Sequence, residues 1–387
     1  MNYQIKTNNH KKIGIFSDIH VGVSNDSKIR LDETQKCVDW IIKKFKNEKV
    51  DWVIFCGDLF NSRYSINVNT LNVGIKLIEE LSFNFEKIFL IEGNHDTYYK
   101  NSNSVNSVNF LQKIGKNDNI KVIDEQPLFI KIDEISLGLY PWGITSEYLK
   151  TIDFETPTYG FGHFEMNGIE MAGGISSGSK FSLSDMFLFG DTLFSGHYHL
   201  NKVYKEIKLN KTLYMIGCPL QLDWGDFGNT KKIMVLNTET GKIDEFKNSK
   251  NAEFKKIFYS SLENNEYDES EIKKICHKNF IKFIIDKQYK FENILKFTDL
   301  IKKFDPHTLN LEYLISISNN SLDNLTNENI KNNSKTNKDY LIDYLENIFP
   351  EYEKIDSALD LDYLKNIGIK YYEKALIPEK DRFEQEL

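Results

Sequence analysis

The chain is poor in cysteine and has no long apolar run. Its four cysteines form no CxxC pair, so neither a disulfide framework nor a thiolate metal cluster is indicated, and this usage suits a reducing cytoplasm. Cys37 and Cys56 lie in apolar patterns and are interpreted as small buried residues. No stretch approaches the roughly 18 apolar residues of a transmembrane helix, and the polar start MNYQIKTNNHKK is unlike a signal peptide. We therefore expect a cytoplasmic protein without a membrane anchor.

An excess of positive charge is also absent. The 387 residues hold 49 Lys+Arg against 57 Asp+Glu, a formal net charge of −8. Most of this acidity lies in residues 338–387, which leaves a nearly neutral body. The balance argues against tight binding of nucleic acid by a general basic surface, although bound cations could make a cleft locally positive.

What the chain does contain is a set of five short polar motifs, each following an apolar stretch. Runs such as IGIF before Ser17 and WVIFC before Gly57 predict strands buried on both faces. Between such runs, apolar residues recur at helical spacing over 32–45 and 68–81. This alternation predicts a layered α/β fold, whose ligands gather at the carboxyl ends of the strands. The motifs at those ends are SDIH (17–20), GD (57–58), GNHD (93–96), GHFE (162–165) and GHYH (196–199).

The residue types in these motifs suit a site for two divalent metal ions. In Asp18-x-His20 an extended backbone would direct a carboxylate and an imidazole toward one metal, and residues 197–199 repeat this spacing. The Asp58 carboxylate can bridge two cations, and Asn94 offers a neutral oxygen. Two hard cations held in this way can polarise a phosphate ester and activate water. A donor set without thiolate suits Mn²⁺, and Fe²⁺ or Zn²⁺ remain possible.

These motifs carry a resemblance to a known family. All five, in order over residues 13–199, resemble the calcineurin-type metallophosphoesterases. Three longer segments are similar, more narrowly, to the nuclease subunit of the double-strand-break repair complex, SbcD in bacteria and its counterpart in tailed phages. These segments are GDLFNSR at 57–63, GHFEMNGIEM at 162–171 and GCPLQLDWGD at 217–226. The resemblance implies an α/β fold in which a β-sandwich is flanked by helices, and it implies Mn²⁺ as the bound metal.

The resemblance also implies a role for individual residues. His95 would face the substrate as a transition-state stabiliser or proton donor, and Asp96 would orient its ring by a hydrogen bond to the other nitrogen. Asn61 stands where several family members have a second histidine, and Arg63 could contact DNA phosphate or be an ordinary solvated arginine. A lone histidine or a single GD is usually a satisfied polar residue or a turn, so only the whole set favours metal ligands. The implied ligands are Asp18, His20, Asp58 and His199 for the first metal, and Asp58, Asn94, His163 and His197 for the second.

The pattern changes along the chain and predicts four segments. Residues 1–248 would form the nuclease domain, 252–318 a small α+β capping domain, 319–337 a polar linker and 338–387 a helical tail. In the family, the capping domain tracks duplex DNA. The lysines that could serve it here, or could simply be solvated, are Lys255, Lys256, Lys273, Lys274, Lys278 and Lys282.

The pattern of the tail, residues 338–387, predicts that it binds a partner protein. Its two amphipathic stretches after a linker need an apolar surface, which in the family is the coiled-coil base of an SMC-like ABC ATPase, although they could also fold back on the chain's own core. A homodimer through the helices at 32–45 and 68–81 is a further family expectation, with packing inside the chain as the alternative.

The expected function is that of a metal-dependent DNA nuclease acting at DNA ends in recombination and repair. The resemblance implies exonuclease action on duplex and endonuclease action on single strands. Two rivals remain, namely a phosphatase or cyclic-nucleotide phosphodiesterase of the same fold, and a non-catalytic interaction module built on this scaffold.

Overall fold

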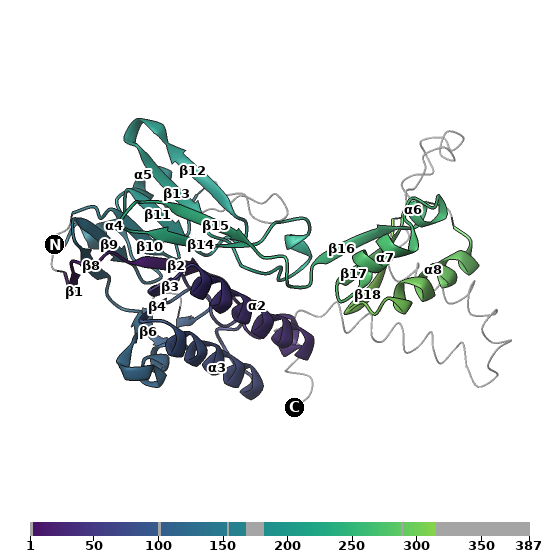
Figure 1. The fold of residues 1–387 in the computed structure, drawn as a ribbon, viewed down its shortest axis with the longest axis horizontal. Coiled ribbons are helices and arrows are strands. Elements are labelled where there is room, and N and C mark those ends of the chain that lie inside the picture. The colour runs from purple at the N-terminus through teal and green to yellow at the C-terminus, as the bar shows by residue number, and fades with distance from the viewer. Residues whose placement is uncertain (1–2, 100–101, 153–154, 168–181, 288, 315–387) are drawn as a thin grey trace, which may run out of the picture. The chain divides into compact units, whose positions relative to one another are not determined.

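The computed structural model describes residues 3–99, 102–152, 155–167, 182–287 and 289–314 (Figure 1). The expected linker and helical tail, 319–337 and 338–387, lie outside the described residues, as do residues 168–171 of the GHFEMNGIEM run. No helix in the described ranges is long and apolar enough to cross a membrane. All four cysteines are unpaired and buried, as expected for Cys37 and Cys56.

The first of two large sheets carries the three N-terminal motifs. Its strand order is β15-β14-β2-β3-β4-β7, in which β2, β3, β4 and β7 are parallel and β14 runs antiparallel to β2. The long apolar runs form the parallel strands because both faces of this sheet are covered. The strands are β2 (Lys12–Phe16), β3 (Trp52–Phe55), β4 (Lys87–Ile91), β7 (Ile120–Ile123), β14 (Lys232–Asn237) and β15 (Ile243–Lys247).

The second large sheet carries the two remaining motifs. Its order is β1-β8-β9-β10-β11-β13-β12, and β9, β10, β11 and β13 are parallel. The strands are β1 (Ile5–Thr7), β8 (Leu128–Ile132), β9 (Ile135–Leu139), β10 (Tyr159–Gly162), β11 (Thr192–Ser195), β12 (Lys202–Glu206) and β13 (Lys211–Met215).

The two sheets pack face to face, and helices cover their outer faces. Ile15, Ile54 and Phe89 of the first sheet meet Leu139 and Phe161 of the second in one apolar layer. Figure 1 shows α2 (Lys28–Asn47) and α3 (Val68–Asn84) side by side along the first sheet, where their apolar residues join a second apolar layer. The short helices α4 (Ser146–Leu149) and α5 (Leu183–Met186) contribute to a third apolar layer with the second sheet. The expected α/β sandwich flanked by helices is confirmed.

Several short elements complete this two-sheet body (residues 3–248). They are α1 (Val23–Asp26), the hairpin strands β5 (Thr97–Tyr99) and β6 (Ser102–Asn106), and 3₁₀ turns at Asn109–Ile114, Lys116–Asp118, Ile207–Leu209 and Trp224–Asp226. The hairpin starts immediately after the GNHD motif and therefore borders the candidate site.

Residues 252–314, called here the small unit, have a core of their own. Its parallel sheet β16-β17-β18 packs with three helices around residues such as Ile257, Ile272, Phe283 and Ile301. The elements are β16 (Phe254–Phe258), α6 (Tyr259–Glu263), α7 (Glu269–Cys276), β17 (Phe280–Ile285), α8 (Phe291–Lys303) and β18 (Thr308–Tyr313). The α+β pattern expected for this stretch is therefore present.

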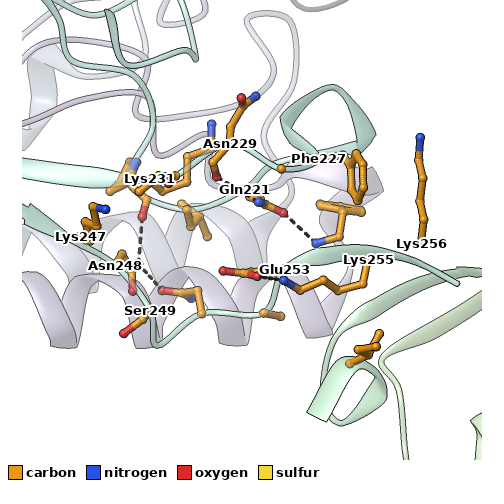
Figure 2. A pocket seen from close by; sticks show the side chains of 18 residues that line it. Gln221, Phe227, Asn229, Lys231, Lys247, Asn248, Ser249, Glu253, Lys255 and Lys256 are labelled. Carbon is orange, nitrogen blue, oxygen red and sulfur yellow. Dashed lines mark hydrogen bonds and ion pairs between the residues drawn. The ribbon is translucent and has the colours of Figure 1, made fainter. Parts of the chain in front are cut away.

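A polar latch joins the small unit to α2. The Glu33 carboxylate accepts hydrogen bonds from the Ala252 N–H at 2.7 Å and from the Asn251 side chain at 2.8 Å. The buried Arg30 donates to the Gln221 carbonyl at 2.7 Å. Figure 2 shows the adjoining pocket of about 520 Å³, where the Gln221 side chain accepts from the Phe254 N–H at 2.7 Å. The latch fixes where residues 252–254 leave the two-sheet body.

Candidate metal centre

All five motifs stand at the carboxyl ends of parallel strands. SDIH, GD and GNHD follow β2, β3 and β4, whereas GHFE begins on the last residue of β10 and GHYH follows β11. The loops after β2 and β3 stay paired beyond the sheet, because the Asp18 N–H donates to the Gly57 carbonyl at 2.9 Å and the Val21 N–H to the Leu59 carbonyl at 2.7 Å. The predicted gathering of the motifs at one edge is what this topology produces.

The backbone at these residues is not extended, which corrects one expectation. Asp18, His20, Asp58 and His197 have φ of 54°, 48°, 61° and 83°. The Asp18 and His20 side chains nevertheless lie close together, with Asp18 Oδ1 3.8 Å from His20 Nε2. They do so through left-handed turns, which cost energy for residues other than glycine and persist only where the surroundings enforce them.

The first group of candidate ligands is Asp18, His20 and His199. One donor atom from each lies within 4.8 Å of the others. The His20 and His199 Nε2 atoms are only 3.1 Å apart. Two imidazole nitrogens aimed at each other need a proton or a cation between them, because both carry lone pairs when deprotonated.

The second group is joined to the first through Asp58. Its Oδ2 lies 3.5 Å from His20 Nε2 and 3.3 Å from His163 Nε2, so one carboxylate oxygen faces both groups. Asn94 Oδ1 lies 3.0 Å from His163 Nε2 and 2.9 Å from His197 Nδ1. The structure thus brings all seven candidate ligands together. Imidazole nitrogens, carboxylates and one amide oxygen suit a pair of divalent cations.

Protein contacts hold the ligands by the atoms that face away from this shared space. His163 Nδ1 lies 2.7 Å from the Cys56 carbonyl, and Asp58 Oδ1 accepts from the His95 N–H at 2.8 Å. Glycine is required close by, since a Cβ on Gly93 would lie 2.2 Å from Asp58 Oδ1. Such supporting contacts fix the orientation of metal ligands.

The electrostatics of the unliganded side chains reflect the same crowding. Burial would raise the pKa of Asp58, but His163 and His20 facing it lower the pKa below its usual range. Burial would likewise lower the pKa of His163, whereas Asp58 raises it to about 9. Beneath the site, burial raises the pKa of Glu92 to about 9. The acidic and basic side chains of the site therefore stabilise one another's charges strongly. Divalent cations bound among them would stabilise the carboxylates in the same way.

His95 and Asp96 are placed differently from each other. His95 is half-buried, with its ring centroid 4.8 Å from that of His20, and its Nδ1 lies 2.6 Å from the Asn61 carbonyl. Asp96 is 1% exposed, and its carboxylate accepts hydrogen bonds from the backbone N–H groups of Asp58, Leu59, Phe60 and Gly93.

The expected role of Asp96 is therefore wrong. It holds the ligand-bearing loops together, and the Asn61 carbonyl contacts the histidine ring nitrogen that was assigned to Asp96. Burial and the Asp58 charge raise the pKa of the Asp96 carboxyl to about 6, while its four backbone donors stabilise the ionised form.

Residues 11–201 match the model of the calcineurin-like phosphoesterase family. This segment is a calcineurin-like phosphoesterase domain. It contains all seven candidate ligands and both His95 and Asp96.

One curated relative and two solved structures illustrate the range of similarity. Exonuclease subunit 1 of Enterobacteria phage T4 is 26% identical over 245 residues, which are 62% of this chain and 68% of the relative. A dimetal phosphatase from Danio rerio is 10% identical with a TM-score of 0.38, over 61% of this chain and 98% of that chain. The Pseudomonas putida nuclease MPE is 13% identical with a TM-score of 0.29, over 60% of this chain and 87% of that chain.

Two features of the phosphoesterase site were missed from the sequence. Trp142 lies just after β9, with its ring centroid 5.3 Å from that of His197 and 5.7 Å from that of His163. A signal existed, because the apolar run before Trp142 ends at the same sheet edge as the motifs. The other feature is a buried ammonium behind His199.

That ammonium belongs to Lys231, which follows the GCPLQLDWGD segment. It donates to the His199 carbonyl at 2.9 Å, lies 3.1 Å from Cys218 Sγ and pairs with the Asp226 carboxylate. His199, Cys218 and Asp226 also have the geometry of a metal-binding group, but a protein cation already lies among them. Lys231 therefore supports the phosphoesterase domain from behind its first ligand group.

Proposed function

We propose that this chain is a metal-dependent DNA nuclease that hydrolyses phosphodiesters at DNA ends in recombination and repair. It would use two Mn²⁺ ions and act as an exonuclease on duplex and an endonuclease on single strands. The observation that carries the proposal is the convergence of seven donor side chains around Asp58, in a domain whose curated relative is named an exonuclease subunit.

The side chains have distinct parts in this proposal. Asp18, His20, Asp58 and His199 would hold one cation, and Asp58, Asn94, His163 and His197 the other. Cations bound there would polarise the phosphate ester and activate water. His95 is close enough to His20 to reach a substrate at the cations, and its contact with the Asn61 carbonyl sets the orientation of its ring.

Arg63 is suited to hold the substrate backbone. It follows Asn61 by two residues, and the Asn61 carbonyl contacts the His95 ring. Among the residues that the structure describes, no carboxylate pairs with Arg63, which leaves its donors for a phosphate. The contribution of Asn61 would come from its backbone carbonyl as well as from its side chain.

The lysines of the small unit give less support to a DNA-capping role. Three of the six are already paired, Lys255 with Glu253, Lys278 with Asp305 at 2.7 Å and Lys282 with Glu312 at 2.6 Å. The Lys256 ammonium lies 4.5 Å from the Phe227 ring centroid. We keep the capping role as a proposal that depends on Lys273 and Lys274 more than on the paired lysines.

A substrate comparison tests the reaction class. The full chain should degrade a linear duplex and cut single strands with Mn²⁺, and Asp58→Ala should abolish this. Turnover of a phosphopeptide or a cyclic nucleotide in preference to DNA would make the chain a phosphatase or cyclic-nucleotide phosphodiesterase. Nuclease activity that survives both Asp58→Ala and His95→Ala would instead mean that the candidate metal centre does not carry out the cleavage. This result would favour a non-catalytic scaffold.

The proposed assembly is tested separately. An SMC-like ABC ATPase would bind residues 338–387, and a homodimer would form through α2 and α3. Truncation after residue 335 should keep cleavage of short substrates and lose co-purification with the ATPase. Loss of cleavage with the ATPase still bound would reverse the assignment of the tail. Light scattering of the full chain reports the dimer.

A further inference from the structure

Three exposed tyrosines lie next to the metal centre, outside the machinery described above. Tyr64, Tyr98 and Tyr99 are 73%, 43% and 51% exposed. The ring centroids of Tyr64 and Tyr98 are 6.0 Å apart and those of Tyr98 and Tyr99 are 4.8 Å apart, both edge to face. We call these three residues the tyrosine cluster. Large exposed aromatic groups gathered in one place mark interaction sites more often than scattered ones do.

The cluster is fixed to the two segments that hold His95. Tyr64 follows Asn61 by three residues and Tyr98 follows His95 by three, and the Asn61 carbonyl contacts the His95 ring. At 3.8 Å per residue, the Cα atoms of Tyr64 and Tyr98 lie within about 11 Å of those of Asn61 and His95. Nucleotides next to a phosphate at the metal centre are within reach of rings at that distance.

Local hydrogen bonds hold both tyrosine-bearing segments in place. The Ser62 hydroxyl accepts from the Ser65 N–H at 3.3 Å and from the Tyr64 N–H at 3.4 Å, which forms a turn. Thr97 is 1% exposed and its hydroxyl donates to Glu92 at 2.6 Å and to the Gly93 carbonyl at 3.0 Å. The neighbouring rings are therefore displayed from anchored backbone.

We propose that the tyrosine cluster is a stacking platform for an unpaired nucleobase beside the scissile phosphate. This inference rests on the proposed nuclease function and extends it to how a single strand is held. Aromatic faces bind every base without reading its sequence, whereas Arg63, one residue before Tyr64, supplies a charge for the backbone. The combination of stacking rings and a nearby guanidinium is the chemistry that single-stranded nucleic acid requires.

The alternative occupant is a second copy of the chain. Val68, the first residue of α3, is 83% exposed and follows Tyr64 closely, so an apolar protein contact could continue onto the cluster. The placement beside His95 favours the base, because a dimer contact has no need to sit at the reacting centre. The experiment separates the two.

The test uses the full chain with Mn²⁺ and single-stranded oligonucleotides of one sequence, in which one stable abasic site is moved step by step past the cut. For the wild type, kcat/KM should fall roughly 5- to 150-fold when the missing base is the one that stacks. Tyr98→Ala and Tyr64→Ala should lower kcat/KM on the intact oligonucleotide and abolish the abasic effect. Tyr98→Phe keeps the ring and should behave as the wild type.

Ile207→Ala is the matched control. Ile207 is 88% exposed and lies in the turn between β12 and β13, at the sheet edge opposite the motifs and outside the helices proposed for the dimer. It should leave both the rate and the abasic effect unchanged. Light scattering of each variant reports the oligomeric state.

The possible outcomes distinguish failure of the stacking platform from failure of the nuclease proposal. An abasic effect that persists in Tyr64→Ala and Tyr98→Ala, or that never appears while the oligonucleotide is cut, overturns the platform and leaves the nuclease proposal standing. Tyrosine variants that change the oligomeric state instead assign the cluster to a second copy. If the wild type hydrolyses bis-p-nitrophenyl phosphate but no oligonucleotide, the nuclease proposal falls and the platform falls with it.

Discussion

Asp96→Asn is the sharpest test of how the site is built. The two oxygens of the carboxylate divide four backbone donors between them. One accepts from Leu59 and Phe60 at 3.1 Å each, and the other from Asp58 at 3.0 Å, from Gly93 at 3.1 Å and from Leu59 at 3.3 Å. An asparagine amide keeps only one oxygen. Depending on which way it turns, one or two N–H groups face another donor.

The magnitude follows from those orphaned groups. Each buried unsatisfied donor costs about 1–3 kcal/mol, so the variant should lose roughly 1–6 kcal/mol of a total stability that is typically 5–15 kcal/mol. Because the freed loops carry Asp58 and Asn94, affinity for Mn²⁺ should fall as well. Urea unfolding of the metal-free chain gives the first quantity and titration calorimetry with Mn²⁺ the second.

Substitution of an exposed aspartate by asparagine is the matched control. Asp191 is an exposed carboxylate on the same two-sheet body that pairs with Lys211 at 3.2 Å, and since exposed ion pairs contribute little, Asp191→Asn should change stability by at most about 1 kcal/mol. If Asp96→Asn were as stable as Asp191→Asn and only slowed the reaction, Asp96 would act through His95 after all. The reasoning from its four backbone contacts would then be refuted.

Three further predictions follow from the same geometry. His95→Ala should keep metal affinity, measured by calorimetry, and lose about 10²–10⁴-fold in cleavage rate because general acid catalysis contributes that much; a loss of bound metal would make His95 a ligand. Lys231→Met should cost about 3–5 kcal/mol in urea unfolding by leaving Asp226 charged and unpaired, and Asp226→Asn in the same chain should recover most of it. Burial would raise the pKa of Glu33, but the Ala252 N–H and the Asn251 amide lower it, so its stabilisation exists above about 4.5 and is lost as the pH falls below that value. The free energy of unfolding should therefore fall more steeply on acidification in the wild type than in Glu33→Gln, and parallel curves would contradict this.

The position of the five motifs could be predicted from the sequence because it depends on strands. Apolar runs that end in polar motifs give the strand ends directly, and parallel strands bring those ends to one edge. Local periodicity was equally informative for α2, which the pattern predicted over 32–45 and which spans Lys28–Asn47. The partners of β2 were not predictable in this way, since β14 reaches it from more than 200 residues away.

The partners of individual side chains could not be predicted. The family resemblance implied that Asp96 contacts His95, but three of its four backbone donors come from residues 58–60, which only the fold brings close. The spacing of Asp18 and His20 suggested an extended backbone, whereas both residues have positive φ. Local sequence patterns do not predict turns that are stabilised by hydrogen bonds to distant residues.

Those strained turns explain why the site needs so many backbone contacts. Residues held at positive φ cost of order 1–3 kcal/mol each, and four of the seven candidate ligands are of this kind. Contacts from Asp96, from the Gly57 carbonyl to Asp18 and from the Asp18 carboxylate to the His197 N–H offset part of that cost. Because these protein contacts hold the candidate ligands, less of a cation's binding energy would go into ordering the loops. It follows that substitution of Asp96 should weaken metal affinity as much as substitution of a candidate ligand does, although no Asp96 atom would touch the metal.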